Sequence, residues 1–431
     1  ADGYYRTFSP NKLTGTANDK DGMGDSSVSD VTSVNQIEIQ IKDEDTGEYW
    51  RGTVEQWGAE KWFPVSNYTP GYPGTWEYTG LLSDDGTWTS GHRYRIKTRA
   101  SDNAGNKEVP DAGVTFIFDN TNATSTVNVP VDGASYSSLS SITGSASDDA
   151  SGIHPAGVKK VEVRIKNEST GQYLTAPDTW GGEVWNVATG TTSWTLNATA
   201  WTSSTTYTIN CRAYDNVGYP SENIEVNFST FTFTFDDTPP SSEITSPTPN
   251  LYSSNLTTIS GTVWDLTTGV NGVKVAIKGK TGWETDRFWN GSTWTSVGTW
   301  AWLDASGSLP SNPNVTVNWN WTTSTTTWTS GNRYELFSKG KDRTDYTPNE
   351  ESPDASGIIF TFDNVKPVSV TTYPAMGVGY SDLPEVYGTA SDSDSGVYPA
   401  GIKNVLISIQ IDPNGSPPGN WWDGDGWDSA S

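Results

Sequence analysis

The chain has 431 residues, of which 33% are hydrophobic, 12% aromatic and 18% charged, and its 51 acidic and 26 basic residues give a net charge of −25. This length predicts roughly three to four domains. The 21 tryptophans exclude an intrinsically disordered stalk, because disordered chains contain few aromatic residues. The acidic balance excludes nucleic acid as a partner, since nucleic-acid binding depends on basic patches, and it suits cation binding in an extracellular medium.

Residues that carry out catalysis, disulfide bonding or membrane insertion are scarce. The single cysteine, Cys211, excludes an intramolecular disulfide and a multi-cysteine zinc site. No apolar run approaches the roughly 18–20 residues that span a bilayer, so we expect no membrane insertion in this segment. The two histidines, His92 and His154, stand where other repeats of the chain have Thr205, Asn332 or Tyr398, and no nucleophile elbow, P-loop or zinc-protease motif occurs. We therefore expect that the chain is not an enzyme.

Internal repeats organise the chain from end to end. Similar segments begin at Leu13 (LTGTANDKDG), Ile142 (ITGSASDDASG), Ile259 (ISGTVWDLTTG) and Val386 (VYGTASDSDSG), and their glycines are 129, 117 and 127 residues apart. Two further motifs recur in the same order. One is the TFIFDNT, FTFTFDDTPP and IFTFDNVKP set, and the other places a tryptophan six residues before a tyrosine. We predict that these aromatic pairs are core residues: Trp88 and Tyr94, Trp201 and Tyr207, Trp328 and Tyr334.

Apolar residues alternate along short runs that are bounded by Gly, Asn, Asp and Ser. Examples are Val161-Val163-Ile165 and Phe231-Phe233-Phe235. This period of two predicts half-buried antiparallel strands, and no segment of useful length has a helical period. We predict an all-β fold of tandem immunoglobulin-like (Ig-like) antiparallel β-sandwiches in an elongated array.

The order GTASDD-SG, then an alternating strand, then SG-x-x-Y-x-I-x-x-RA-x-DNAGN, then FTFDNT, resembles bacterial Ig-like repeats. Such repeats are the tandem domains of large surface adhesins and secreted filamentous proteins, and the resemblance covers essentially the whole chain. It implies an extracellular or cell-surface location. One departure is that no disulfide joins the two sheets, so tryptophan and phenylalanine packing must hold each core.

Four repeat domains are predicted in chain order: 1–122 with its first strand missing or partial, 123–239, 240–366, and 367–431 as an N-terminal half only. Half a sandwich does not bury its own inner face. We expect that the chain is an internal or mature piece of a longer array. The alternative is that a neighbouring chain completes the last repeat by strand addition.

Acidic loops form the candidate site. In an Ig-type sandwich the loops after the second and sixth strands lie at the end where the linker enters, and Ca2+ takes six to eight oxygen ligands. The resemblance implies calcium at domain junctions; the alternative is that these residues only form turns. The candidates at the first junction are Asp119, Asn120, Asp148, Asp149, Asp215 and Asn216. Weaker candidates are Asp236, Asp237, Asp265, Asp342, Asp363, Asp392 and Asp394.

Tryptophan enrichment suggests a second interpretation, because flat aromatic rings stack on sugars. Nine tryptophans occur from Trp264 to Trp328, with both of these counted, and Trp319 alternates with Trp321 on one strand face. We consider this pair a candidate surface for glycans or for a neighbouring protomer, with core packing as the alternative. The main functional prediction is a structural or adhesive repeat region that serves as a stiff spacer, stalk or filament body. Its partners are then neighbouring repeats, other copies in a filament or surface layer, or glycans.

Overall fold

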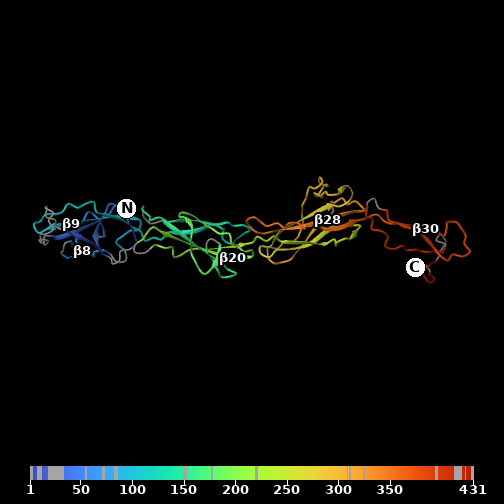
Figure 1. Ribbon diagram of the computed structural model, residues 1–431, viewed down its shortest axis with the longest axis horizontal. Coiled ribbons are helices and arrows are strands. Elements are labelled where there is room, and N and C mark those ends of the chain that lie inside the picture. The colour runs from blue at the N-terminus through green and yellow to red at the C-terminus, as the bar shows by residue number, and fades with distance from the viewer. Residues whose placement is uncertain are drawn as a thin grey trace. The chain divides into compact units, whose positions relative to one another are not determined.

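A computed structural model gives the conformation of most of the chain. It describes residues 3–6, 12–17, 34–53, 56–69, 73–81, 86–148, 153–175, 178–218, 222–307, 309, 312–323, 326–393, 397–411, 420–422 and 424–428. The described elements are strands, apart from one short 3-10 turn, Gly282–Glu284. None of these residues belongs to a helix long and apolar enough to cross a membrane. The fold is all-β, as predicted (Figure 1).

Two compact units divide the chain, residues 1–236 and 237–431. The first unit holds two sandwiches. The strands of the first sandwich are β1 (Gly3–Tyr5), β2 (Leu13–Ala17), β3 (Val34–Asp43), β4 (Tyr49–Gly52), β5 (Gln56–Gly58), β6 (Phe63–Pro64), β7 (Asn67–Thr69), β8 (Gly74–Tyr78), β9 (His92–Asp102) and β10 (Val114–Phe118). Those of the second are β11 (Thr124–Val129), β12 (Ala134–Tyr136), β13 (Ser141–Ser147), β14 (Val158–Asn167), β15 (Tyr173–Thr175), β16 (Thr179–Gly181), β17 (Asn186–Val187), β18 (Thr189–Gly190), β19 (Ser193–Asn197), β20 (Thr205–Asp215) and β21 (Thr230–Phe235).

The second unit holds a third sandwich and a smaller strand pair. The strands of the third sandwich are β22 (Ser241–Ser246), β23 (Tyr252–Ser253), β24 (Thr258–Trp264), β25 (Val270–Gly279), β26 (Leu303–Asp304), β27 (Val317–Thr322), β28 (Asn332–Asp342) and β29 (Ile358–Phe362). Beyond it β30 (Val368–Tyr373) pairs with β31 (Tyr387–Ser391), and β32 (Trp421–Trp422) pairs with β33 (Trp427–Asp428).

The strand order in each sandwich is that of an Ig-like fold. In the second sandwich one sheet runs β11-β13-β19-β18 and the other β12-β21-β20-β14-β15-β16. The edge strand β12 is parallel to β21, whereas β14 and β20 are antiparallel. The parallel edge recurs as β1 on β10 and as β23 on β29, and the antiparallel pair recurs as β3 with β9 and as β25 with β28. These are the A-B-E-D and A′-G-F-C sheets of Ig domains.

Each core lies between the two sheets, where the apolar residues of the alternating strands meet. In the second sandwich Val163 lies opposite Cys211 and Ile165 opposite Ile209, and all four side chains are fully buried. The three motif tyrosines have no exposed surface, and each motif tryptophan meets its tyrosine edge-on at a centroid distance of 4.8–4.9 Å. Trp88 is buried, while Trp201 and Trp328 are partly buried against the core.

The proposed aromatic surface at Trp319 and Trp321 is a wrong prediction. Trp319 is 1% exposed, and Trp321 packs against the core of the third sandwich. The ring of Trp319 covers Gly261, as Trp194 covers Gly144 and Trp76 covers Gly15, so that a Cβ on any of these glycines would meet the indole. The face of β27 that carries the two tryptophans is therefore the inner face, and the exposed Asn318 and Asn320 form the outer one.

Candidate junction site

The residues Trp-Thr-Ser before strands β9, β20 and β28 position the linker that leaves each sandwich. In the first sandwich the amide of Thr89 donates to the hydroxyl of Tyr94 (2.7 Å), and the hydroxyl of Ser90 donates to the carboxylate of Asp119 (2.9 Å). Thr202 and Tyr207 make the same contact at 2.8 Å, as do Thr329 and Tyr334. The motif fixes the aspartate that directly follows the last strand of the sandwich.

Asp119 joins the first sandwich to the second. Its Oδ1 accepts hydrogen bonds from Ser90 of the first sandwich and from Thr121 in the linker, and its Oδ2 accepts one from the amide of Ala156 (2.8 Å) in the second. The aspartate is fully buried, and only residues 119–123 separate β10 from β11. One side chain thus bonds to both domains across a five-residue linker.

The same arrangement recurs after the third sandwich. Asp363 accepts from the hydroxyl of Ser330 (3.2 Å) and from the amide of Ala400 (2.6 Å). The neighbouring amide of Gly401 donates to Asp392 at 2.7 Å, as Gly157 donates to Asp148 at 2.7 Å in the second sandwich. The serine, aspartate and two backbone-amide contacts of the first junction thus recur after the third sandwich.

Three buried carboxylates meet at the first junction. Asp119, Asp148 and Asp215 each offer an oxygen, and these oxygens lie within 4.8 Å of one another. Asp215 accepts from the amide of Val217 (2.8 Å) and from Nδ2 of Asn223 (2.7 Å). Burial and the neighbouring carboxylates of Asp148 and Asp119 raise the pKa of Asp215 to about 7, because charges of one sign at short range disfavour ionisation.

The other candidates have different surroundings. Asn120 and Asn216 are exposed, and Asn216 donates its amide hydrogens to the carbonyls of Ala156 and Gly157 instead of presenting its oxygen. Asp149 and Asp394 lie outside the described residues. Asp237 is exposed, whereas Asp236 is buried and accepts from Ser203 at 3.3 Å.

In the third sandwich Asp265 and Asp342 are buried with oxygens within 4.8 Å of each other. Asp265 accepts the backbone amides of Thr267, Thr268 and Gly269. Asp342 accepts from Thr344 and Asn349. These contacts are those of aspartates that organise loops.

Asn223 is the residue that sequence reasoning missed. It is fully buried, and its Nδ2 donates to the backbone carbonyls of Asp119 and Thr121 as well as to Asp215. An asparagine bonds to the same aspartate position in every complete repeat: Asn106 with Asp102, Asn223 with Asp215 and Asn349 with Asp342. The separations are 4, 8 and 7 residues, so no fixed spacing marks the pair.

The first-junction cluster fits a hard divalent cation. Three carboxylates converge there, and the buried Oδ1 of Asn223 has no hydrogen-bond donor in the part of the chain that the structure describes. Calcium prefers such carboxylate and amide oxygens. Asp119, Asp148 and Asp215 would hold the ion, and its charge would offset their mutual repulsion.

No protein-family profile matches the sequence, and no curated protein matches it significantly. Among solved structures the chain is similar to the fibronectin(III)-like modules of CbhA from Clostridium thermocellum, with 12% identity, 55% of this chain and 90% of that chain covered, and a TM-score of 0.24. It is also similar to domains of titin (11% identity, 84% and 96% covered, TM-score 0.29) and to the ectodomain of human desmocollin-1 (11% identity, 78% and 57% covered, TM-score 0.30). The strand order described above defines the class: tandem Ig-like and fibronectin-like β-sandwich modules.

Proposed function

We propose that the chain is a repeat region of a large secreted or cell-surface bacterial protein, in which it acts as a stiff spacer, stalk or filament body. The observation that carries this proposal is the linker aspartate. Asp119 and Asp363 each accept hydrogen bonds from the sandwich before them and from the module after them. Such bonding favours one orientation of neighbouring modules. A stiff spacer requires a fixed orientation, whereas an isolated binding domain does not.

Calcium is part of the proposal at the first junction. Without a counter-ion, the repulsion among Asp119, Asp148 and Asp215 opposes the aligned arrangement that brings them together. An ion that binds only the aligned state stabilises it by mass action, by about 2.7 kcal/mol at a hundred times its dissociation constant. The proposed role of calcium is therefore to stiffen the junction.

The test compares residues 1–239 as wild type and as Asp119→Ala, each with calcium and with a chelator, by small-angle scattering. We expect the wild type with calcium to have the largest maximum dimension and the narrowest distribution of interatomic distances. The variant should have a smaller maximum dimension that does not change with calcium. Asp132→Ala is the matched control, because Asp132 is exposed and bonds within the second sandwich only. Identical distributions for wild type and Asp119→Ala would contradict the spacer proposal.

A glycan-binding module is the second candidate, and one observation in the third sandwich favours it. Trp300 is 45% exposed and stacks on Trp302 with ring centroids 5.4 Å apart and planes at 11°. Phe288 and Trp302 pack against the Trp300 ring, so the part of the indole that stays exposed is the surface that a sugar ring would contact. We expect soluble polysaccharide to quench the tryptophan fluorescence of the wild type and of Trp283→Ala, but not that of Trp300→Ala. Trp283 is the control because it is 64% exposed and lies outside this stack. No quenching in the wild type would dismiss this candidate.

A further inference from the structure

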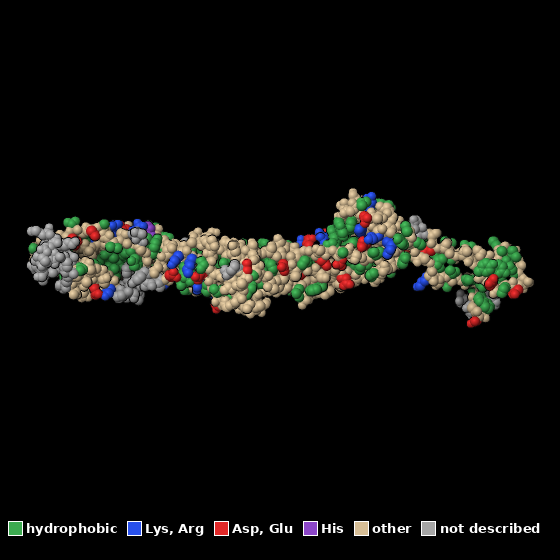
Figure 2. Space-filling model, in the orientation of Figure 1, with side chains coloured by type: hydrophobic (Ala, Val, Ile, Leu, Met, Phe, Trp, Pro, Cys, Tyr) green, Lys and Arg blue, Asp and Glu red, His purple; other side chains and the backbone are tan. Residues whose placement is uncertain are grey.

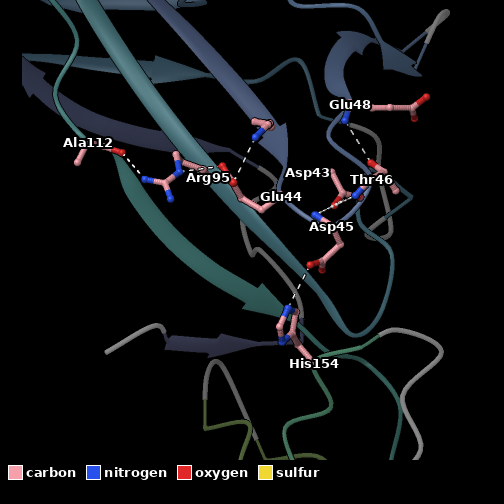
Figure 3. Close-up of polar contacts among 9 residues, drawn as sticks. Asp43, Glu44, Asp45, Thr46, Glu48, Arg95, Ala112 and His154 are labelled. Carbon is pink, nitrogen blue, oxygen red and sulfur yellow. Dashed lines mark hydrogen bonds and ion pairs between the residues drawn. The ribbon is translucent and has the colours of Figure 1, made fainter.

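Both histidines of the chain lie at one place, on the surface where the first sandwich adjoins the second. His92 is the first residue of β9, and Nδ1 of its ring is 2.8 Å from Oδ2 of Asp43 at the end of β3. His154 belongs to the loop before β14, and its Nε2 is 3.1 Å from Oδ1 of Asp45. Figure 3 shows the ring of His154 directed at Asp45 from the second sandwich.

The two carboxylates are held so that one oxygen of each faces an imidazole. Oδ1 of Asp43 accepts the amides of Asp45 (2.9 Å) and Thr46 (3.2 Å), which leaves Oδ2 toward His92. Oδ2 of Asp45 accepts the amide of Arg93 (2.8 Å), which leaves Oδ1 toward His154. Hydrogen bonds to the outer oxygen orient ligating carboxylates in metal sites in the same manner.

Glu44, the acidic residue between them, is turned away. Its carboxylate pairs with Nε of Arg95 at 2.8 Å (Figure 3). It also pairs with Nζ of Lys42 at 3.2 Å. These cations lower the pKa of Glu44 against the opposing effect of burial. The acidic groups that face the histidines are therefore Asp43 and Asp45.

The local turn does not require a carboxylate at position 43. In the second sandwich Asn167 holds the equivalent position, and its Oδ1 accepts the amides of Ser169 (2.9 Å) and Thr170 (3.0 Å) in the same way. An amide thus suffices to form this turn. The first sandwich has an aspartate at position 43 and a histidine at position 92, whereas the second sandwich has Asn167 and Thr205 at the equivalent positions.

We propose that Asp43, Asp45, His92 and His154 form a binding site for a divalent transition-metal ion, with zinc as the reference ion. Zinc takes imidazole nitrogen and carboxylate oxygen at about 2.0–2.2 Å in tetrahedral geometry, which places two ligands roughly 3.3 Å apart. The two imidazole–carboxylate separations are 2.8 and 3.1 Å, and the ligand atoms of Asp43, Asp45 and His92 lie within 4.8 Å of one another. The ion replaces the protons shared between each imidazole and its carboxylate.

The ion has a route in from solvent, and it joins two domains. The side chains of His92 and His154 are 18% and 27% exposed, so the site opens to water. Three ligands come from the first sandwich and one from the second. At the junction after the third sandwich Tyr398 takes the place of His154. Its backbone amide donates a hydrogen bond to a glycine carbonyl (3.0 Å), as that of His154 does, and Arg333 lies over its ring. The site is thus a property of the first junction.

The first test titrates the full chain with ZnCl2 by calorimetry, in excess calcium that competes for hard oxygen sites. The second measures nitrogen coupling by electron paramagnetic resonance of bound Cu2+. We expect one zinc per chain and nitrogen hyperfine structure. His154→Tyr and His92→Asn introduce residues that other repeats carry at these positions, so the fold is retained, as circular dichroism checks. Each should weaken zinc binding at least about tenfold, and the double variant should abolish the nitrogen coupling.

Asp148→Asn is the control, because it alters the acidic cluster and none of the four proposed ligands; its zinc affinity should equal that of the wild type. Zinc binding of equal strength in the wild type and the double histidine variant would overturn the proposal, as would the absence of saturable zinc binding to the wild type. Because the histidine variants leave Asp119, Asp148 and Asp215 unchanged, these outcomes do not depend on whether the spacer proposal holds.

Discussion

Three adjacent residues, Trp-Thr-Ser, make three different contacts in each complete repeat. The indole packs edge-on against the motif tyrosine, the threonine amide donates to the tyrosine hydroxyl, and the serine hydroxyl binds the linker aspartate. Burial raises the pKa of Tyr94 and Tyr334 to about 12, so these hydroxyls stay protonated at all physiological pH values. The core and the junction are therefore connected through one short segment.

The motif glycines give a prediction about packing. Gly144 lies against the ring of Trp194 and the carbonyl of Thr126 without room for a Cβ. We expect Gly144→Ala to lower the free energy of unfolding of the second sandwich by about 1–3 kcal/mol, the usual cost of overpacking. Gly182→Ala is the control, because a Cβ there meets nothing within 4 Å. Equal denaturation midpoints for the two variants would show that Trp194 moves aside at no cost.

The raised pKa of Asp215 gives a prediction about pH. Its folded value of about 7 lies above the ordinary 3.8, so the folded protein holds a proton that the unfolded chain releases. The associated stability is fully present below about pH 4 and is lost as the pH rises through about 7. With a chelator present, the unfolding free energy should fall on the order of 2–4 kcal/mol between about pH 5 and pH 8. Asp215→Asn should flatten this slope, which denaturant titration across the pH range measures; an unchanged slope would contradict it.

Residue types were easier to predict than their surroundings. The Trp-x5-Tyr pairs and the acids Asp119, Asp148 and Asp215 follow from repeats that the sequence displays. Asn223 does not, because its distance from Asp215 varies among repeats. Nor does the direction of Trp319: alternation shows that two residues share a strand face, but it does not say which face meets the opposite sheet.

At the scale of elements, the longest paired strands hold each sandwich together. β14 and β20 pair from Val158–Asp215 to Asn167–Tyr207 with one irregularity, and β3–β9 and β25–β28 repeat this register pattern. The alternating sequence predicted these strands because one face of each is apolar. It did not predict the short strands β15 to β18, whose pairing is set by the turns between them and not by a buried face.

The division into repeats is itself a prediction to test. Residues 123–239 contain both sheets of the second sandwich and its whole core cluster. We expect this fragment to fold alone and to unfold in one cooperative transition with an all-β circular dichroism spectrum, and residues 240–366 to do likewise. Residues 180–300, which cut across two sandwiches, serve as the control and should show no cooperative transition. Failure of both whole-repeat fragments to fold would refute the proposed boundaries.

At the scale of the molecule, the last repeat differs from the others in its exposed apolar surface. Residues 400–411 repeat the sequence pattern of β14, yet Val405, Ile407 and Ile409 are 51%, 61% and 39% exposed, whereas Val161, Val163 and Ile165 are fully buried. The space-filling view shows hydrophobic side chains gathered over this C-terminal part (Figure 2). No counterpart of β20 covers them among the described residues.

This surface predicts how the chain behaves in solution. Exposed contiguous apolar patches bind hydrophobic dyes and promote association. We expect the 431-residue chain to enhance the fluorescence of such a dye and to associate as its concentration rises, and residues 1–366 to do neither. Sedimentation velocity and dye titration on both chains measure this. Equal dye binding by the two would place the apolar surface elsewhere.

The shared linker aspartate also bears on how such a protein changes over evolutionary time. The serine and the aspartate come from the preceding repeat, and the carboxylate accepts a hydrogen bond from a backbone amide of the following one, that of Ala156 or Ala400, which almost any sequence supplies. A recombination event that deletes, duplicates or exchanges a whole repeat therefore recreates the serine–aspartate–amide hydrogen bonds at the new boundary, whereas the bond from Asn223 depends on which repeat follows. An event that cuts inside a repeat separates the serine from its aspartate and splits a core. Gain and loss of length in steps of one repeat is thus the kind of change that this architecture tolerates.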